Sequence, residues 1–483
     1  MIYRFKNENK TIEYTEPVTI LEAARSLDIM LSSEVCGIKK CGRCKVYLEN
    51  EDKIVKACEY KPDKDIDIVT YYSEKKHVKE VFNHIKDSEY SGKYYVAVDI
   101  GTTNVELRFY NEKHELVCDV VTENPLRRYG SDVMSLISYA NTKEKLNHLH
   151  KILKGECDKL IHDYISENKI IIKGFTGNTT MMHILCNKDI SSLGRSPFTT
   201  DYYGGEFIDA HTYIAPIIKS HVGADSLCCL YGIENIFKGI NLIVDVGTNS
   251  EILLVKGDEV WACSAAAGPA FESSNISCGM KNAKGAVVKA TYKGDYYYDV
   301  EKIGSGISYR DYRCNQIKGI SGSAILDLVE VLNKSNVIDS KGSFIGNKRD
   351  YFQLSPHCKD VVVTAQDIRN VILGKAAIAT GIISLMREVG IAEDNIDNIF
   401  ITGDFGIHIS VENAISIGLF PNVEVGKYIK VENAALQGLV NMIVNGNVRK
   451  DAKNLAKKIK HLDLTSQKEF NDIFVENMKI RKE

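Results

Sequence analysis

The fold is decided by residues 95–110, which read Tyr95-Val-Ala-Val-Asp99-Ile-Gly101-Thr102-Thr103-Asn104-Val-Glu-Leu-Arg-Phe-Tyr110. An apolar strand ends at an acidic residue, a polar turn with glycine follows, and a second strand begins. The same order returns in residues 242–255, Leu242-Ile-Val-Asp245-Val-Gly247-Thr248-Asn249-Ser250-Glu-Ile-Leu-Leu-Val255. When Asp99 is aligned with Asp245, Gly101 falls on Gly247 and Thr102 on Thr248. A repeat with matched flanks predicts two similar lobes.

Each copy of this hairpin has the chemistry of a phosphate site. The glycine lets backbone N–H groups approach an anion, and the threonine hydroxyls add donors. Two such hairpins facing across a cleft would clasp a nucleotide, with Asp99 and Asp245 holding a hydrated Mg²⁺. The predicted phosphate-binding residues are Gly101, Thr102, Thr103 and Asn104 in one lobe and Gly247, Thr248 and Asn249 in the other. A single copy would be an ordinary tight hairpin, so the pairing carries the prediction.

Four cysteines near the N-terminus form the second informative pattern, Cys36-x4-Cys41-x2-Cys44-x13-Cys58. Three thiolates on one short loop with a fourth arriving from elsewhere are the ligands of a [2Fe–2S] cluster. A zinc site would need a second close pair of cysteines or histidines, and only Cys58 and His77 are near. We therefore expect a cluster that moves one electron at a time.

The residues around these cysteines predict a small domain. Ile2–Phe5 and Thr11–Tyr14 are expected strands, and Thr19 with Glu22 three residues later predicts a capped helix. Lys45–Glu49 and Lys53–Ala57 alternate as a hairpin that fills the gap before Cys58. Residues 1–73 resemble the β-grasp [2Fe–2S] ferredoxin fold. The charged segment 74–93 that follows is expected to be a linker.

Composition excludes several classes of function. The chain has 483 residues and a net charge of −3, which gives no reason to expect a nucleic-acid partner. No apolar run reaches the length of a membrane span, and the polar start is no signal peptide. Thirteen cysteines in a large chain without a leader indicate reduced thiols and a cytoplasmic protein, and the nine outside the cluster pattern are expected to be structural. The chain has no P-loop motif, and no dinucleotide-binding glycine motif follows a strand.

The paired Asp-x-Gly-Thr hairpins resemble those of the superfamily that contains acetate and sugar kinases, heat-shock ATPases and actin. Asn398-Ile-Phe-Ile-Thr402-Gly403-Asp404-Phe405-Gly406 is similar to its adenosine motif, with Gly403 and Gly406 lying against the nucleotide. Further segments narrow the resemblance: Phe175–His183, His221–Asp225, Ala266–Glu272, Gly319–Ala324 and Asn433–Gly438. Together with the N-terminal iron–sulfur domain, they resemble the ATP-dependent reductive activators of corrinoid proteins.

This resemblance implies the architecture and the activity. The fold class is α+β and α/β, with the β-grasp domain followed by a two-lobed actin-like ATPase of duplicated ribonuclease-H-like lobes, residues 94–240 and 241–483 with C-terminal helices. The implied activity is one-electron reduction of a corrinoid protein from Co(II) to Co(I) at the expense of ATP, with the electron entering through the cluster. The implied partners are a corrinoid protein of an anaerobe's methyltransferase system and a low-potential electron donor. Longer members carry an extra middle domain, which the short segment 74–93 replaces here.

Several roles stay open at this point. Asp225 is the candidate to orient the attacking water, or else it caps a helix over Ser226–Tyr231. Glu272, Asn178 and Thr179 are further candidates for the site, and Lys375 for reaching the nucleotide. Two other functions compete: an activator of the 2-hydroxyacyl-CoA dehydratase type, and a non-catalytic electron-transfer or redox-sensing protein. The oligomeric state is open, with a homodimer among the options.

Overall fold

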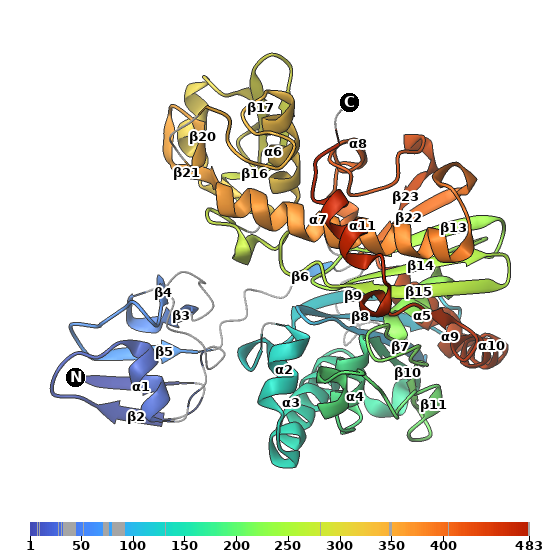
Figure 1. Cartoon of the computed structure of the whole chain (residues 1–483). Helices are drawn as coiled ribbons and strands as arrows, with labels where there is room; N and C mark the ends of the chain where they lie inside the picture. The colour runs from blue at the N-terminus through green and yellow to red at the C-terminus, as the bar shows by residue number, and fades with distance from the viewer. Residues whose placement is uncertain are drawn as a thin grey trace. The chain divides into compact units, whose positions relative to one another are not determined.

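The chain folds into two compact units, here called the first and the second unit (Figure 1). The computed structural model describes residues 1–6, 8, 10–27, 29, 31, 45–51, 53–70, 77–79, 92–130, 132–280, 282–346, 350–403 and 405–481. The first unit comprises Met1–Gly232 and Ala435–Lys457, and the second unit comprises Ile233–Ala434 and Lys458–Glu483.

The N-terminal part of the first unit is a five-stranded sheet with one helix on it. The strands β1 (Ile2–Phe5), β2 (Lys10–Glu13), β3 (Lys45–Leu48), β4 (Lys53–Lys56) and β5 (Ile66–Val69) lie in the order β2-β1-β5-β3-β4, with β1 parallel to β5. The helix α1 (Ile20–Ser26) buries Ile20, Ala23 and Ala24, and Thr19 and Glu22 form its capping box. This is the layout of a β-grasp domain, and it confirms the predicted strands, capped helix and hairpin.

Part of the predicted linker forms a β-strand. β6 (His77–Lys79) pairs antiparallel with β9 (Leu116–Glu123), so this part of residues 74–93 is an edge of the next sheet. Gly92 and Lys93 lead directly into β7 (Tyr94–Ile100). The rest of the predicted linker lies outside the described residues.

The main sheet of the first unit has seven strands in the order β11-β12-β10-β7-β8-β9-β6. It adds β8 (Asn104–Asn111), β10 (Ile170–Gly177), β11 (Glu206–Phe207) and β12 (Thr212–Ile214) to those already named. Val96, Ala97 and Val98 of β7 are consecutive and all fully buried, which is typical of a central strand covered on both faces. The helices of this part are α2 (Val133–Tyr139), α3 (Lys143–His162), α4 (Thr179–Leu185) and α5 (Ala224–Gly232).

Two helices from far along the chain complete the first unit. α9 (Ala434–Val444) and α10 (Gly446–Ala456) lie beside α5 in Figure 1. A Cβ on Gly174 of β10 would lie 2.4 Å from Cγ2 of Ile443, so the missing side chain admits α9. The hydroxyl of Tyr231 in α5 donates a hydrogen bond to Asp451 of α10 (2.8 Å). The prediction that all C-terminal helices belong to the lobe beginning at residue 241 is therefore wrong for these two helices.

The second unit contains a six-stranded sheet in the order β23-β22-β13-β14-β15-β24. Its strands are β13 (Ile240–Asp245), β14 (Ser250–Lys256), β15 (Glu259–Ala265), β22 (Asn398–Thr402), β23 (Tyr428–Lys430) and β24 (Lys460–His461). A smaller sheet contains β16 (Ala286–Tyr292), β17 (Tyr296–Val300), β18 (Gly304–Ser308) and β19 (Gly319–Ile320), and β20 (Tyr351–Ser355) pairs with β21 (Cys358–Thr364). The helices are α6 (Gly322–Lys334), α7 (Ala365–Val389), α8 (Val411–Ser416) and α11 (Phe470–Asn477).

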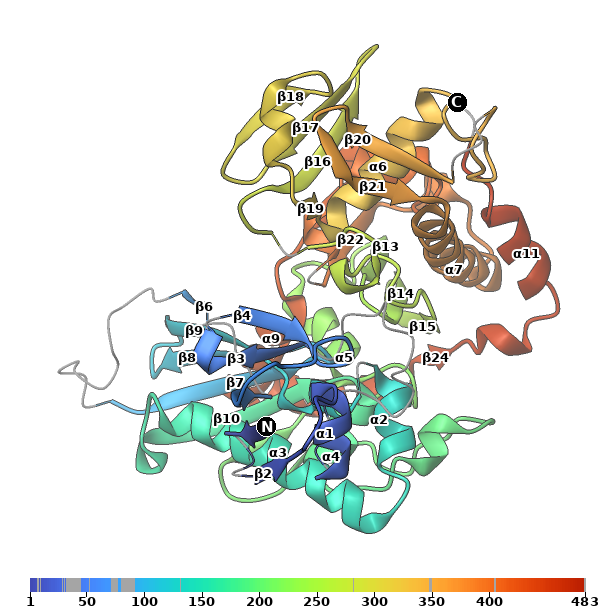
Figure 2. The same ribbon diagram turned by 90° about the vertical axis from the view of Figure 1, so that its left-hand side faces the viewer.

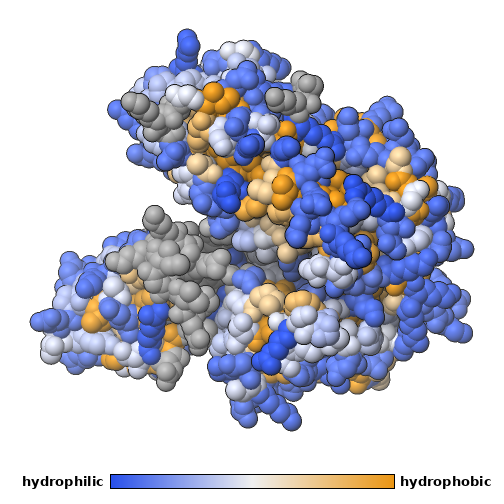
Figure 3. Space-filling view, in the orientation of Figure 1, coloured by the Kyte–Doolittle hydropathy of each residue, from blue (hydrophilic) through white to orange (hydrophobic). Residues whose placement is uncertain are grey.

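The helix α7 lies in the core of the second unit, as predicted for Ala365–Leu385. A capping box of Thr364 and Asp367 starts it, and Gly390 in the left-handed region (φ 69°) ends it. By length and composition α7 could cross a membrane, but 78% of its most apolar stretch is buried inside the protein. The helix α11 lies beside it in both ribbon views (Figure 2). The face of the molecule drawn in Figure 3 is mostly hydrophilic, with scattered apolar patches.

The two main sheets repeat one another. β12-β10-β7-β8-β9 of the first unit has the same order and strand directions as β23-β22-β13-β14-β15 of the second. In each unit the Asp-x-Gly-Thr turn joins two antiparallel strands, and a parallel strand lies on the other side of the first one. This duplication confirms the predicted two-lobed fold class.

The contact between Gly174 and Ile443 predicts a non-additive pair of mutations. Gly174→Ala should overpack the site and cost about 1–3 kcal/mol of unfolding free energy, while Ile443→Ala should cost about 2–5 kcal/mol. In the double variant the new methyl group occupies space that the isoleucine vacates. Thermal or urea unfolding should therefore give a double-mutant loss smaller than the sum by about 1 kcal/mol or more. Simple additivity would show that α9 does not pack on β10.

Candidate nucleotide site

In the first unit, the turn after β7 is held tightly by a buried asparagine. A Cβ on Gly101 would lie 3.1 Å from the carbonyl oxygen of Asn104, so the turn suits glycine. Asn124 is fully buried, and its Nδ2 donates to the Gly101 carbonyl (2.6 Å). Its backbone N–H donates to the Thr103 carbonyl (2.8 Å). Asn124 was not predicted, because its only signal in the sequence is an asparagine placed directly before a proline.

Asn178 connects the turn to the neighbouring strand and helix. Its Oδ1 accepts from Met181 N (3.0 Å) as the N-cap of α4, and its Nδ2 donates to Thr102 Oγ1 (3.1 Å). The capping role and the site role thus belong to the same side chain. A Cβ on Gly177 would lie 2.5 Å from the Ile100 carbonyl oxygen, so this glycine admits the turn beside β10. Thr179 turns away and donates to the Lys219 carbonyl (2.6 Å).

Asp225 lies beside Asn178 in the first turn of α5. A Cβ on the intervening Gly223 would lie 2.6 Å both from Asn178 Cα and from Asp225 Oδ1. The helix begins at Ala224, so Asp225 is inside it and is not the N-cap of a helix over Ser226–Tyr231. Loss of hydration raises the pKa of this carboxyl to about 6, although Oδ1 accepts from Ser226 N (2.7 Å). A carboxyl with this pKa can accept a proton near neutrality.

In the second unit, the turn after β13 is also tight around its glycine. A Cβ on Gly247 would lie 3.0 Å from the carbonyl oxygen of Asn249, two residues on, whereas Gly101 meets the carbonyl of the residue three positions on. The Thr248 hydroxyl donates to Glu272 Oε1, and the side chains of both residues are partly exposed. The structure therefore brings Glu272, a weaker candidate in the sequence, directly to a predicted phosphate-binding residue.

The predicted adenosine motif meets this turn from the adjacent parallel strand. Thr402 of β22 lies opposite Asp245 of β13, and Gly403 follows in the left-handed region (φ 86°). A Cβ on Gly403 would lie 2.3 Å from Asp245 Oδ1 and 2.8 Å from the Val246 carbonyl oxygen. A Cβ on Gly406 would lie 2.9 Å from Ile401 Cγ2. Asp404 lies outside the described residues.

An aromatic stack that was not predicted joins the loop after β15 to the loop after β22 in the second unit. The rings of Phe271 and Phe405 are stacked with centroids 4.7 Å apart and an interplanar angle of 8°. A Cβ on Gly322 at the start of α6 would lie 2.1 Å from the Phe271 carbonyl oxygen, and a Cβ on Gly374 of α7 would lie 3.2 Å from Phe271 Cζ. Phe271 is thus enclosed by the adenosine motif, α6 and α7.

The iron–sulfur pattern is described only at its last member. Cys58 is buried and follows β4, whereas Cys36, Cys41 and Cys44 lie outside the described residues. Among the residues that the structure describes, no group of three His, Cys, Asp or Glu side chains could hold a metal ion. Of the other nine cysteines, Cys186 and Cys278 are partly buried and the remaining seven are buried.

Two further residues, His183 and Lys375, lie outside this site. His183 is fully buried and hydrogen-bonded to the Thr179 carbonyl (2.8 Å) and the Thr200 hydroxyl (2.9 Å), so it is structural. Lys375 donates to the carbonyls of Asn477 (2.7 Å) and Lys479 (2.6 Å), which are not part of either hairpin. The prediction that Lys375 reaches the nucleotide is therefore wrong.

The duplicated sheets with paired glycine turns define the actin-like class of nucleotide-binding proteins. A family model described as "C-terminal domain of RACo the ASKHA domain" matches residues 239–483, and one described as "RACo middle region" matches residues 94–234. The chain belongs to the RACo family. Because the family's middle region falls on residues 94–234, the expectation of a missing middle domain is corrected.

Named relatives cover most of the chain. The corrinoid activation enzyme RamQ of Eubacterium limosum is 27% identical over 433 residues, which are 80% of this chain and 70% of the relative. The [Co(II) methylated amine-specific corrinoid protein] reductase of Methanosarcina barkeri is 22% identical over 422 residues, 79% of this chain and 76% of the relative. The solved reductive activator for a corrinoid, iron–sulfur protein shares the fold, with a TM-score of 0.67 and 23% identity over 99% of this chain and 98% of that one.

Gly403→Ala tests the contact between the adenosine motif and Asp245. A Cβ there would displace the Asp245 carboxylate, so we expect ATP hydrolysis to fall at least tenfold. Gly257→Ala is the matched control, because Gly257 also has a positive φ (59°) but a Cβ on it would meet nothing within 4 Å. Both variants carry a backbone cost of about 1–2 kcal/mol, and only Gly403→Ala should lose activity. Equal ATPase rates in the two variants would contradict the assignment.

Proposed function

We propose that this protein is an ATP-dependent reductive activator that reduces a corrinoid protein from Co(II) to Co(I) by one electron. Membership of the RACo family carries the proposal, and both named relatives act on corrinoid proteins. The corrinoid protein would belong to a methyltransferase system of an anaerobe. The electron would come from a low-potential donor in the cytoplasm and enter through a [2Fe–2S] cluster.

The nucleotide would be held by both hairpins. Gly101, Thr102, Thr103 and Asn104 would bind phosphate oxygens in the first unit, and Gly247, Thr248 and Asn249 in the second. Asp99 is the residue before the last of β7, Asp245 is the last residue of β13, and the two would supply the carboxylates that a hydrated Mg²⁺ requires. The two turns fit this role because a Cβ on either glycine would press on the loop's own carbonyl. Asp225 would accept the proton of the attacking water.

The cluster would be held by Cys36, Cys41, Cys44 and Cys58. The register of the β3–β4 hairpin supports this ligand set, because Lys45, the residue after Cys44, pairs with Lys56, two residues before Cys58. When bound, a [2Fe–2S] cluster supplies one-electron transfer. The chain's own contribution is a small, well-packed sheet in which Cys58 contacts the buried core around Tyr3, Ile20 and Ile66.

ATP is needed because the cobalt couple lies below ordinary donors. For one electron, each 59 mV uphill costs about 1.4 kcal/mol. A gap of a few hundred millivolts is therefore several kcal/mol, which the hydrolysis of one or two ATP can supply. We propose that ATP changes how the corrinoid protein is bound, and that ATP need not contact the cluster.

The decisive assay is anaerobic and combines the protein, a low-potential reductant, Mg-ATP and a Co(II) corrinoid protein. We expect the Co(I) absorbance to appear only when ATP is present. Asp245→Ala should reduce this rate at least tenfold, whereas Asp258→Ala, an exposed aspartate in the β14–β15 turn, should not. The absence of any ATP-dependent Co(I) signal with methyltransferase corrinoid proteins would overturn the proposed function.

Cys58→Ala tests the cluster separately from the ATPase. The variant should lose the visible absorbance and the reduced-state electron paramagnetic resonance signal of a [2Fe–2S] cluster, together with corrinoid reduction. ATP hydrolysis should persist, because Cys58 belongs to the N-terminal sheet and not to either hairpin. Asp245→Ala is the reciprocal control and should keep the cluster spectrum. Wild-type iron content in Cys58→Ala would show that another residue is the fourth ligand.

A further inference from the structure

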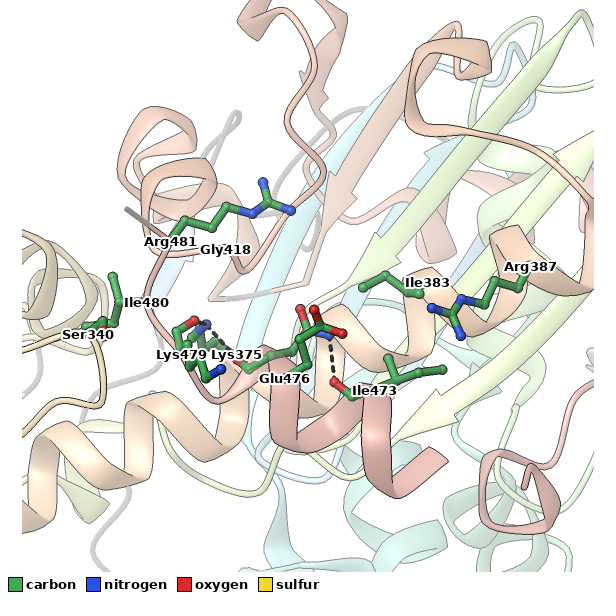
Figure 4. Close-up of a pocket in the computed structure, with 11 residues that line it drawn as sticks. Ser340, Lys375, Ile383, Arg387, Gly418, Ile473, Glu476, Lys479, Ile480 and Arg481 are labelled. Carbon is green, nitrogen blue, oxygen red and sulfur yellow. Dashed lines mark hydrogen bonds between the residues drawn. The ribbon is translucent and has the colours of Figure 1, made fainter. Parts of the chain in front are cut away.

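The second unit contains a basic pocket that the nucleotide site does not use. Its volume is about 540 Å³, and it lies between α7, α11 and the C-terminal segment (Figure 4). Its charged lining consists of the basic side chains Lys375, Arg387, Lys479 and Arg481 and the acidic side chain Glu476. We define this set as the tail pocket.

Lys375 is the buried base of the tail pocket. Only 1% of the residue is exposed, and its ammonium donates to the carbonyls of Asn477 (2.7 Å) and Lys479 (2.6 Å). These bonds satisfy carbonyls at the end of α11, a common role for lysine. When Lys375 is protonated, its ammonium has three N–H donors, so one is left beyond these two bonds among the described residues.

Like charges meet at this base. Burial, and after it the positive charge of Arg481, lowers the pKa of Lys375 to about 7. A like charge and loss of hydration both disfavour the charged form of a lysine, and an anion bound beside it would favour that form. Figure 4 shows Lys479 beside Lys375, which adds a third basic side chain to the same end of the pocket.

The other charged groups of the pocket do not neutralise this end. Arg387 pairs with Glu469 (2.5 Å), and Arg481 with Glu393 (3.5 Å) and the Phe420 carbonyl (3.2 Å). Lys479 and Glu476 both line the pocket and are both exposed to solvent. Capping of α11 by Lys375 explains the buried lysine, but it does not explain why Lys479 and Arg481 line the same pocket.

We propose that the tail pocket binds a small organic oxyanion, with Lys375, Lys479 and Arg481 contacting its phosphate or carboxylate group. Lysine and arginine donors are the usual protein partners of both groups. The volume exceeds that of a single phosphate, and the apolar lining residues Ile473 and Ile480 would face the rest of the ligand. The site is separate from both hairpins, so it would bind its ligand alongside ATP.

Calorimetry on the full chain with pyrophosphate and with citrate tests the site, and a saturating non-hydrolysable ATP analogue keeps the hairpins occupied. We expect one of the two anions to bind with a dissociation constant of 1 mM or below, and its identity separates a phosphate ligand from a carboxylate ligand. Lys479→Gln and Arg481→Gln should each weaken binding at least fivefold. Lys293→Gln, an exposed lysine outside the pocket, should leave binding unchanged.

Proton uptake provides a second readout that a structural lysine would not give. At pH 8 the Lys375 amine is mostly neutral, and a bound anion should raise its pKa, so binding should take up a proton. The binding heat should then depend on the ionisation enthalpy of the buffer in the wild-type protein and not in Lys375→Met. If Lys375→Met fails to fold, Lys479→Gln and Arg481→Gln still decide the proposal. No binding of either anion, or unchanged binding in both of these variants, overturns it.

Discussion

Both units depend on one constraint, which is that the end of the neighbouring parallel strand closely approaches the Asp-x-Gly-Thr turn. In the second unit a Cβ on Gly403 would lie 2.3 Å from Asp245 Oδ1, and in the first unit a Cβ on Gly177 would lie 2.5 Å from the Ile100 carbonyl oxygen. Thr176 pairs with Asp99 as Thr402 pairs with Asp245, so Thr-Gly occupies the same place in both sheets. Gly403 of the predicted adenosine motif in the second unit thus has a counterpart, Gly177, beside the Asp-x-Gly-Thr turn of the first unit.

Much of this could be predicted from sequence because the signals are local. The two turns, the capped helix α1, the hairpin before Cys58 and the core helix α7 each follow from neighbouring residues. What could not be predicted depends on contacts between distant segments. The burial of Asn124 beneath a turn, the stacking of Phe271 on Phe405 and the return of α9 to the first unit leave no periodic pattern. An apolar helix records that it is buried but not which sheet buries it.

Two adjacent residues of α7 contact different segments of the second unit. Gly374 packs against Ala270 and Phe271, where a side chain would collide with the loop that carries Glu272. Lys375, the next residue, points to the C-terminal segment and fixes the end of α11. A buried helix with a capping box at its start is well suited to hold these two segments at a fixed distance from one another.

The return of residues 435–457 to the first unit also has a consequence for biosynthesis. As the chain leaves the ribosome, β10 and α5 emerge long before the helix that fills the space above Gly174. The buried side chains Leu439, Met442 and Ile443 arrive only after nearly the whole second unit has been made. Domains usually fold in the order of their synthesis, but here the first unit must wait with an open apolar surface. Nascent chains stalled before residue 435 should therefore be the form of this protein that most needs a chaperone.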